Sequence, residues 1–421
     1  MRITILAPGS RGDIQPYAAL GKGLKSAGFE VNIATHAYFE RFVRSCGLDF
    51  SPLSGNPRNI LTSISGQDWL ESNYRPLTFV KRMRVALEPI IGKIFDDSLE
   101  ACRGSQAVLF GAISAFAGLT IAEKLGIKAI PAPKQHLHPT RTYPCGMMMP
   151  ALSLGGLYNR MTYPLGFQIY WQILRPLINH WRKKLEMQPE SIHGPINTGL
   201  KQHPPCLYGF SEHVIPRAPE WGKEVTISGY WMLDKEDDWP PPKDLHRFLE
   251  NGPVPVYVGF GSMATRNARK TTQITLEVLK ITGLRGVLLS GWGGIDLADL
   301  PKSVFPLEFA PHDWLFPRMK AVVHHGGSGT TAIGLKSGKP SVLVPFFADQ
   351  PYWGWHVQRL KVGPKPIPST RLTVKRLAEA LDKAVNTPEI STRAAVLGGK
   401  LSKEDGVGNA VKAMVKIMQM A

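Results

Sequence analysis

The sequence predicts a doubly wound α/β fold that is built twice along the chain, and three observations lead to this prediction. Short apolar runs without polar alternation recur throughout, which is typical of parallel strands buried on both faces. Helical patterns separate these runs, as crossover helices do between parallel strands. The rhythm stops in a charged, proline-rich stretch at about 212–253 and then restarts, which indicates two halves joined by a linker.

The first half, residues 1–215, opens with a clear strand, turn, helix and strand pattern. Its expected elements are a strand at Arg2–Ala7, a glycine-rich turn at Gly9–Asp13, a helix at Pro16–Ala27 and strands at Glu30–Thr35, Ala107–Phe110 and Lys128–Pro131. Residues 133–190 break this rhythm with methionines, tryptophans and tyrosines. Such side chains form adaptable apolar surfaces, so this stretch is either an ordinary part of the core or the wall of an apolar cavity.

The second half, residues 251–405, follows a linker at 216–250 and repeats the rhythm. Its expected elements are strands at Pro255–Phe260, Gly286–Ser290, Ala321–His324 and Ser341–Pro345, with a helix at Thr271–Thr282. A helical stretch at Gly408–Met420 lies in a last segment, 406–421. Open α/β sheets bind ligands at the carboxyl ends of their strands, so we expect a cleft between the strand ends of the two halves.

The composition is that of a packed globular protein, with 43% hydrophobic and 20% charged residues. No uninterrupted run of about 18 apolar residues predicts a transmembrane helix, and the first residues lack the pattern of a signal peptide. Cys46, Cys102, Cys145 and Cys206 form no CxxC pair. That spacing argues against a zinc site or a disulfide framework and favours a cytoplasmic protein.

The formal net charge of +17 predicts an affinity for anions. The basic residues are scattered and no nucleic-acid-binding module accompanies them, so we expect no nucleic-acid partner. A solvated basic face is one explanation of this charge. The alternatives are an anionic ligand or peripheral contact with an anionic membrane, for which Leu77–Phe95 is the candidate segment.

A glycine-rich turn in the second half is the strongest local signal. An apolar strand ends at His324 and His325, three glycines follow at 326, 327 and 329, and a helix is expected to begin near Thr330. Glycines allow positive φ and close approach of an anion, and a helix N-terminus offers free N–H groups to phosphate. The hydroxyls of Ser328 and Thr330 add donors. A plain tight turn between strand and helix is the alternative, and the pattern is not a Walker loop.

Two further turns carry polar side chains where a strand is expected to end. Asp349 and Gln350 follow the strand at Ser341–Pro345, where they suit either a helix cap or the hydroxyls of a sugar. In the first half, Ser10, Arg11 and the Gly12 N–H follow the first strand and can face phosphate. Asp13 ends this turn, where an N-cap role is the structural alternative.

These motifs together resemble the UDP-glycosyltransferase superfamily with the GT-B fold. The stretch from His324 to Thr331 and the stretch from Pro345 to Trp353 resemble its donor-binding signature, and Gly9–Leu24 resembles its N-terminus. The similarity is greatest to the branch of the sterol glucosyltransferases and the glycopeptide-antibiotic glycosyltransferases. It does not extend to residues 55–200. The resemblance implies two Rossmann-like domains that face each other across a cleft, with 406–421 packing back across them.

The resemblance also implies roles for the donor-side residues. His325 and the backbone of Gly327–Thr330, including Ser328 and Gly329, would hold a pyrophosphate, while Asp349 and Gln350 would hold the sugar. Ser262 resembles a further phosphate or ribose contact. Trp292 lies where the family places the base, although a buried core tryptophan is an equal alternative. The donor would be a UDP-sugar, with UDP-glucose as the expectation, and no other cofactor is implied.

On the same grounds Asp13 would be the catalytic base of an inverting transfer to an apolar acceptor such as a sterol, polyketide or flavonoid. Many relatives use a histidine here, but no histidine lies between Met1 and Thr35, so His136, His138 and His312 are only candidate helpers. No DxD motif is present, and we therefore expect no metal. The alternatives are a nucleotide-sugar epimerase or hydrolase on this fold, and a non-catalytic lipid or nucleotide-sugar binding protein.

Overall fold

The computed structural model describes residues 1–72, 75–146, 154–195, 204–233, 239–261, 263, 268–290 and 300–419. The chain forms two compact units. Unit 1 consists of Met1–Trp69, Arg75–Leu233 and Glu404–Ala421, and unit 2 consists of Leu70–Tyr74 and Asp234–Lys403. The chain therefore leaves the first unit after residue 233 and returns to it for its last helix.

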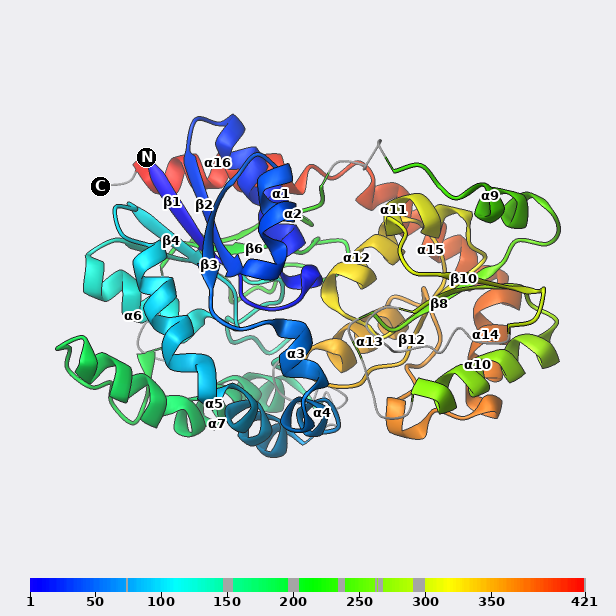
Figure 1. Cartoon of the computed structure of the whole chain (residues 1–421), viewed down its shortest axis with the longest axis horizontal. Helices are drawn as coiled ribbons and strands as arrows, with labels where there is room; N and C mark the ends of the chain where they lie inside the picture. The colour runs from blue at the N-terminus through cyan, green and yellow to red at the C-terminus, as the bar shows by residue number, and fades with distance from the viewer. Residues whose placement is uncertain are drawn as a thin grey trace. The chain divides into compact units, whose positions relative to one another are not determined.

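Unit 1 is built on a five-stranded sheet whose strand order is β3-β2-β1-β4-β5, and every pairing in it is parallel (Figure 1). The strands are β1 (Arg2–Leu6), β2 (Glu30–His36), β3 (Asp49–Leu53), β4 (Ala107–Phe110) and β5 (Lys128–Pro131). β4 is buried along its whole length, as its unbroken apolar run predicts. A separate parallel pair is formed by β6 (Cys206–Tyr208) and β7 (Val225–Ile227).

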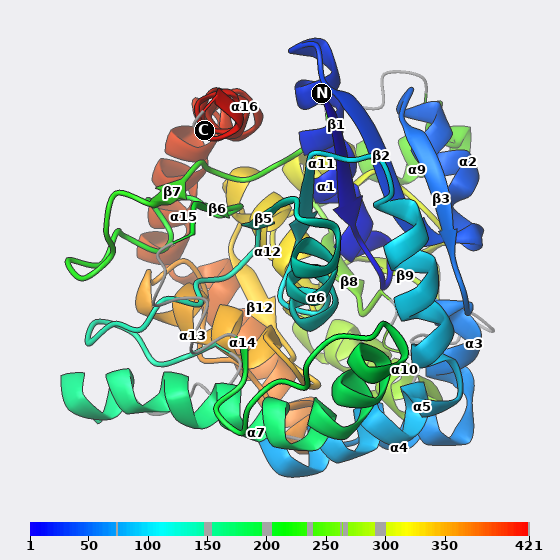
Figure 2. The ribbon, with the colours of Figure 1, turned by 90° about the vertical axis from the view of Figure 1, so that its left-hand side faces the viewer.

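Helices connect the successive strands of this sheet, as in a doubly wound fold. The helices of unit 1 are α1 (Arg11–Ser26), η1 (Ala37–Phe39), α2 (Glu40–Ser45), α3 (Pro57–Thr62), α4 (Ile64–Leu70), α5 (Pro76–Ala101), α6 (Ala115–Leu125), α7 (Gly156–Lys184) and α16 (Gly406–Gln419). Figure 2 shows α7 next to α5, with which it packs. The tryptophans of the stretch expected to break the rhythm belong to this helix and to the core, because Trp171 and Trp181 are buried against Phe116 and Phe95.

Unit 2 repeats the topology of unit 1. Its parallel sheet has the order β10-β9-β8-β11-β12, which is again third, second, first, fourth and fifth along the chain. The strands are β8 (Val256–Gly259), β9 (Gly286–Leu289), β10 (Val304–Leu307), β11 (Val322–His324) and β12 (Ser341–Leu343). The helices are α9 (Lys243–Glu250), α10 (Ala268–Thr282), α11 (His312–Leu315), η3 (Phe316–Arg318), α12 (Ser328–Lys336), α13 (Gln350–Arg359), η4 (Ser369–Arg371), α14 (Val374–Asn386) and α15 (Pro388–Leu401).

The predicted fold class is therefore confirmed, with small shifts at the element ends. The largest shift is at α1, which begins at Arg11 rather than at Pro16. Pro16 thus lies inside the helix, where it cannot donate to the carbonyl oxygen of Gly12 four residues earlier. In each unit the strand order reverses beside the first strand, at β1/β4 and at β8/β11. Crevices at such switch points are where open α/β sheets bind ligands.

The structure contains, in its described part, no helix with the length and apolar character that crossing a bilayer requires. The last helix of the chain, α16, packs on α1 of unit 1. Gly23 makes this packing possible, because a Cβ atom there would collide with Val407 and would lie 3.0 Å from Cγ2 of Val411.

We predict that Gly23→Leu destabilises unit 1 by about 1–3 kcal/mol, since extra carbons in a tight contact force neighbours apart. Thermal unfolding followed by circular dichroism would measure the change. Gly92→Ala on α5 is the matched control, because a Cβ at Gly92 meets nothing within 4 Å. That helical substitution should stabilise by about 0.5–1 kcal/mol. Equal stability of the Gly23 variant and the wild type would contradict the role given to this contact.

Candidate active site

The turn after β1 is closed by the carboxylate of Asp13. Ser10 is the N-cap residue of α1, and Asp13 stands in the third position of the helix, so Asp13 is not the N-cap. Its Oδ2 accepts hydrogen bonds from the backbone N–H and from the hydroxyl of Ser10, both at 3.0 Å. This is the reciprocal half of a capping box. The side chain of Asp13 is thereby held at the carboxyl end of β1.

Lys134 contacts the same carboxylate from the segment after β5. Its Nζ lies 2.9 Å from Oδ1 of Asp13, and it also donates to the carbonyl oxygen of Gly12 at 3.2 Å. That carbonyl is accessible because Pro16, four residues later, has no N–H with which to occupy it. The two paired side chains are 14% and 29% exposed, for Lys134 and Asp13 respectively, so the pair is only partly open to solvent.

Two opposing effects set the pKa of Asp13. Burial by itself raises the pKa of the carboxyl group, but the Lys134 ammonium and the hydrogen bonds from Lys134 and Ser10 outweigh it. The net pKa is lowered, so the group is ionised at neutral pH. Tyr17 lies nearby and donates to the carbonyl oxygen of Ala132 at 2.8 Å. Burial raises the pKa of the Tyr17 phenol, and the Asp13 charge adds to this effect, so Tyr17 stays protonated.

The remaining sequence candidates near this turn have other surroundings. The guanidinium of Arg11 lies over the ring of Phe42, 4.8 Å from its centroid. His136 is buried with its Nδ1 2.9 Å from the hydroxyl of Tyr163, and burial followed by the charge of His138 lowers its pKa to about 3. His138 is hydrogen-bonded to Tyr208 in the same aromatic cluster. His312 belongs to unit 2, where it stacks on Phe316.

The glycine-rich turn of unit 2 connects β11 to the N-terminus of α12. His324 is fully buried, and its Nδ1 accepts the N–H of Gly326 at 3.1 Å. Of the three glycines, Gly326 adopts positive φ, at 91°. Gly327 instead has a φ of −60° as the N-cap of α12, and Gly329 is already helical, so the expectation of positive φ is wrong for both. The helix begins at Ser328, two residues before the predicted start.

His325 follows the strand and is half-buried between two glycines. A Cβ atom at Gly327 would lie 2.5 Å from its Nε2, and one at Gly261 would lie 3.1 Å from its Cε1. A larger residue at Gly327 would therefore collide with the ring, and one at Gly261 would be tight against it and strained by its φ of 59°. The two glycines come from the turns after β11 and β8, which flank the switch point of this sheet. The N–H groups at the start of α12 and the ring of His325 therefore lie together at the carboxyl ends of the unit 2 strands.

Asp349 and Gln350 lie in the turn after β12, together with a residue in an unusual conformation. Ala348 adopts a φ of 54°, which costs an alanine about 1–2 kcal/mol. Asp349 is the N-cap residue of α13 but makes no side-chain cap bond; its Oδ2 accepts from the Trp353 indole at 3.0 Å. Gln350 is buried, and its Oε1 accepts from the N–H of Phe346 at 2.8 Å. The Gln350 amide therefore shapes this turn.

Two of the predicted donor contacts, Ser262 and Trp292, lie outside the described residues. The structure adds residues that the sequence analysis did not single out, namely Lys134, Pro16, Gly261 and Trp353. Lys134 carried a usable signal, because it is a charged residue just after a predicted buried strand. Within the ranges that the structure describes, no group of three or more His, Cys, Asp or Glu side chains could hold a metal ion.

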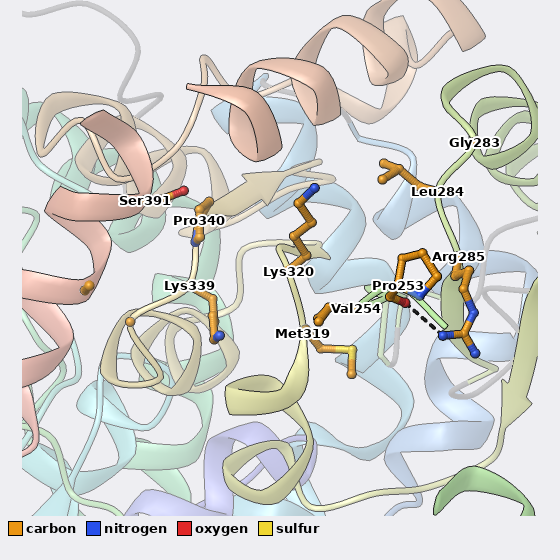
Figure 3. A pocket seen from close by; sticks show the side chains of 12 residues that line it. Pro253, Val254, Gly283, Leu284, Arg285, Met319, Lys320, Lys339, Pro340 and Ser391 are labelled. Atoms are coloured by element: carbon orange, nitrogen blue, oxygen red, sulfur yellow. Dashed lines mark hydrogen bonds between the residues drawn. The ribbon is translucent and has the colours of Figure 1, made fainter. Parts of the chain in front are cut away.

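A cavity in unit 2 lies at the opposite edge of its sheet, at the amino ends of the strands (Figure 3). Its lining comprises Pro253, Val254, Gly283, Leu284, Arg285, Met319, Lys320, Gly338, Lys339, Pro340, Ser391 and Ala395. Arg285 is occupied by a 2.8 Å hydrogen bond to the carbonyl oxygen of Pro253. Burial lowers the pKa of Lys339. None of the residues predicted to bind the donor lines this cavity.

Comparison with known proteins follows the division into two units. Residues 3–132 match the glycosyltransferase family 28 N-terminal domain, and residues 289–405 match the C-terminal domain of erythromycin biosynthesis protein CIII-like proteins. A sterol 3-beta-glucosyltransferase of Arabidopsis thaliana is 36% identical over 98% of this chain and 67% of its own length. One of Aspergillus clavatus is 34% identical over 100% of this chain. The chain spans only 30% of that fungal relative.

Solved structures of antibiotic glycosyltransferases share the fold over the whole chain. The glycosyltransferase of kitacinnamycin has a TM-score of 0.70 at 19% identity, covering 99% of this chain and 98% of its own. The calicheamicin glycosyltransferase CalG4 has a TM-score of 0.69 at 15% identity, with the same coverage. At such identities the likeness establishes the GT-B fold alone. Together with the sequence relatives, it shows that the chain belongs to the glycosyltransferase family that includes the sterol 3-beta-glucosyltransferases.

Proposed function

We propose that this chain transfers glucose from UDP-glucose to the hydroxyl of an apolar acceptor, with a sterol as the first expectation. The observation that supports this most directly is the ionised Asp13 carboxylate at the β1/β4 switch point. The names of the plant and fungal relatives support the sugar and the acceptor class. The alternatives are a nucleotide-sugar epimerase or hydrolase and a non-catalytic binding protein.

In this proposal the donor binds to unit 2. The ring of His325 and the N–H groups of Gly327–Thr330 face the diphosphate, since a helix N-terminus stabilises negative charge. Asp349 and Gln350 bind the sugar hydroxyls, and Oε1 of Gln350 also accepts the N–H of Phe346 in the same turn. Ser10, Arg11 and the Gly12 N–H of unit 1 add donors for the phosphates, and Ser262 and Trp292 stay proposed contacts of the phosphate or ribose and the base. A related structure contains thymidine diphosphate, which supports a nucleotide diphosphate site on this fold.

The proposed reaction is a single displacement. The acceptor O–H bond breaks, its proton passes to the Asp13 carboxylate, and the oxygen forms a bond to the anomeric carbon. The bond from that carbon to the diphosphate breaks on the opposite face, and UDP leaves with the electron pair, so the configuration inverts. A positioned base of this kind contributes about 10²–10⁴-fold to the rate. Preorganised N–H donors at the leaving diphosphate stabilise its developing charge.

We also propose a cytoplasmic protein that touches anionic membranes. Four free cysteines suit a reducing compartment. Within the segment expected to touch the membrane, Leu77 and Val85 are exposed, but Phe79, Val80, Ile94 and Phe95 are buried. A denser exposed apolar set lies at the start of α7, where Leu157, Met161 and Leu165 are 71%, 58% and 56% exposed. These three residues recur at four-residue spacing and so share one helix face.

The charge around this face fits an anionic surface. The sequence from Lys124 to Leu185 contains lysines and arginines but no aspartate or glutamate, and Arg160 is exposed between the apolar residues. Each basic residue near an anionic bilayer contributes about 1 kcal/mol to binding. We therefore place the membrane contact on the first turns of α7 rather than on Leu77–Phe95.

The proposed activity predicts a glycoside when the protein is incubated with UDP-glucose and a sterol, detected by mass spectrometry. Asp13→Asn should reduce this product by about 10²–10⁴-fold, because the amide cannot accept the proton. Calorimetry should show unchanged UDP affinity for the variant. Asp49→Asn, at an exposed carboxylate in β3, is the matched control. Release of free glucose alone would support a hydrolase, an epimerised UDP-sugar would support an epimerase, and binding without any product would support a passive protein.

The rate of transfer should be the same in EDTA. In the proposed reaction the α12 N-terminus, His325 and Arg11 stabilise the leaving diphosphate, and no metal ion is needed. Initial rates with and without the chelator would measure this. Loss of turnover that magnesium restores would contradict a metal-independent reaction.

Leu157→Glu combined with Met161→Glu should abolish flotation with liposomes that contain phosphatidylserine, because two added carboxylates oppose both the apolar and the charge attraction. Ile281→Glu in unit 2, at a residue that is 60% exposed, is the control and should float like the wild type. A wild-type protein that fails to float with anionic vesicles would remove the membrane proposal.

A further inference from the structure

The two carboxylate oxygens of Asp13 have different hydrogen-bond partners, which decides where an acceptor hydroxyl can approach. Oδ2 of Asp13 already accepts two hydrogen bonds from Ser10, so both of its lone-pair directions are in use. Oδ1 accepts from Lys134 at 2.9 Å, and a carboxylate oxygen accommodates a second partner. The acceptor hydroxyl is therefore expected to approach Oδ1, the oxygen that the lysine contacts.

We propose that Lys134 is a positioning residue for glycosyl transfer, which holds the Asp13 carboxylate in place and ionised while an apolar acceptor covers it. This inference rests on the proposed role of Asp13 as the base. The two residues follow β1 and β5, which lie on either side of β4 in the sheet. Their ion pair thus connects two strand ends that are more than a hundred residues apart in sequence.

The position of Lys134 is itself secured by the backbone of α1. Its Nζ donates to the Gly12 carbonyl oxygen as well as to Asp13. Pro16 leaves this carbonyl without its helical partner, and a carbonyl so placed is satisfied by another donor. Tyr17, hydrogen-bonded to Ala132 in the same segment after β5, ties that segment to α1 a second time. The lysine therefore has two fixed acceptors rather than one flexible contact.

When an apolar acceptor covers Asp13, the ion pair with Lys134 is needed to keep the carboxyl group ionised. Covering a carboxylate with apolar surface removes its hydration and can raise its pKa by about 3–5 units, which would protonate the base before reaction. A cation within hydrogen-bond distance lowers the pKa by about 1–3 units and offsets much of that rise. Among the described residues, the groups that face Asp13 are Ser10 at the N-cap of α1, Tyr17 on α1 and Lys134 on the segment after β5. Of these three, Lys134 is the cation.

The proton balance of the step is unchanged by this role. The acceptor proton passes to Oδ1 of Asp13 as the new C–O bond forms, and UDP departs with the electrons of the broken bond. Lys134 takes no part in the proton transfer. Its charge favours the ionised carboxylate before the transfer, so its effect appears as a displaced acid limb of the pH profile rather than as a new chemical step.

The test is the pH dependence of kcat for wild type and Lys134→Met with UDP-glucose and a sterol. Transfer needs ionised Asp13, so activity falls as the pH drops through the pKa of that group. Removing the cation should raise this pKa and move the acid limb up by about 1–3 pH units. Lys134→Arg keeps a cation and should move the limb back toward the wild-type position. Lys25→Met, which removes a lysine bonded to the Gly47 carbonyl oxygen, should leave the profile unchanged.

A direct titration separates this inference from the proposed function. With carboxyl-labelled aspartate, the NMR resonance lost in Asp13→Asn belongs to Asp13, and its titration requires no turnover. We expect it to titrate at higher pH in Lys134→Met, or in Lys134→Gln if the methionine variant does not fold. A wild type that yields no glycoside would defeat the proposed function, but this titration would still report the ion pair. Unchanged titration and an unchanged acid limb in a folded Lys134 variant would overturn the role of Lys134.

Discussion

Burial of both sheet faces is the constraint on which the rest of this molecule depends. Strands such as β4 and β8 are covered along their whole length, and polar side chains buried in the sheet, such as Thr4 and Asn32, are hydrogen-bonded within the protein. Groups that bind a ligand are therefore expected in the turns at the strand ends, where backbone groups and helix N-termini are available. Asp13, Lys134, His325 and Asp349 all follow a strand at its carboxyl end.

The two units meet this constraint in different ways. Unit 1 presents a carboxylate whose two oxygens are bonded to Ser10 and Lys134, so its charge and its orientation are set by side chains. Unit 2 presents backbone and ring N–H groups, and it uses glycines at 261 and 327 to leave room for the His325 ring. A fixed negative group suits proton abstraction, whereas fixed donors suit an anionic leaving group.

One of these turns also contains a strained backbone conformation. Ala348 holds a positive φ directly before Asp349, and the Gln350 amide bonds to the backbone of that turn. A strained residue persists only where its surroundings determine the conformation, and such residues cluster at functional sites. The Asp349 carboxylate itself accepts a hydrogen bond from the Trp353 indole. The Gln350 amide thus bonds within the turn that precedes α13, and the sugar contact that the motif implied for it stays a prediction.

The sequence by itself determined the doubly wound fold, because unbroken apolar runs, glycine turns and helical patterns are local properties of the chain. It also singled out Asp13, His325 and Asp349 as candidates, since each stands in or beside a turn that follows such a run. Only the tertiary structure decided how these groups are partnered. Lys134 reaches Asp13 across β4, Pro16 leaves the Gly12 carbonyl open to it, and Gln350 turns inward to Phe346. Such contacts depend on strand order and side-chain direction, which residue spacing does not encode.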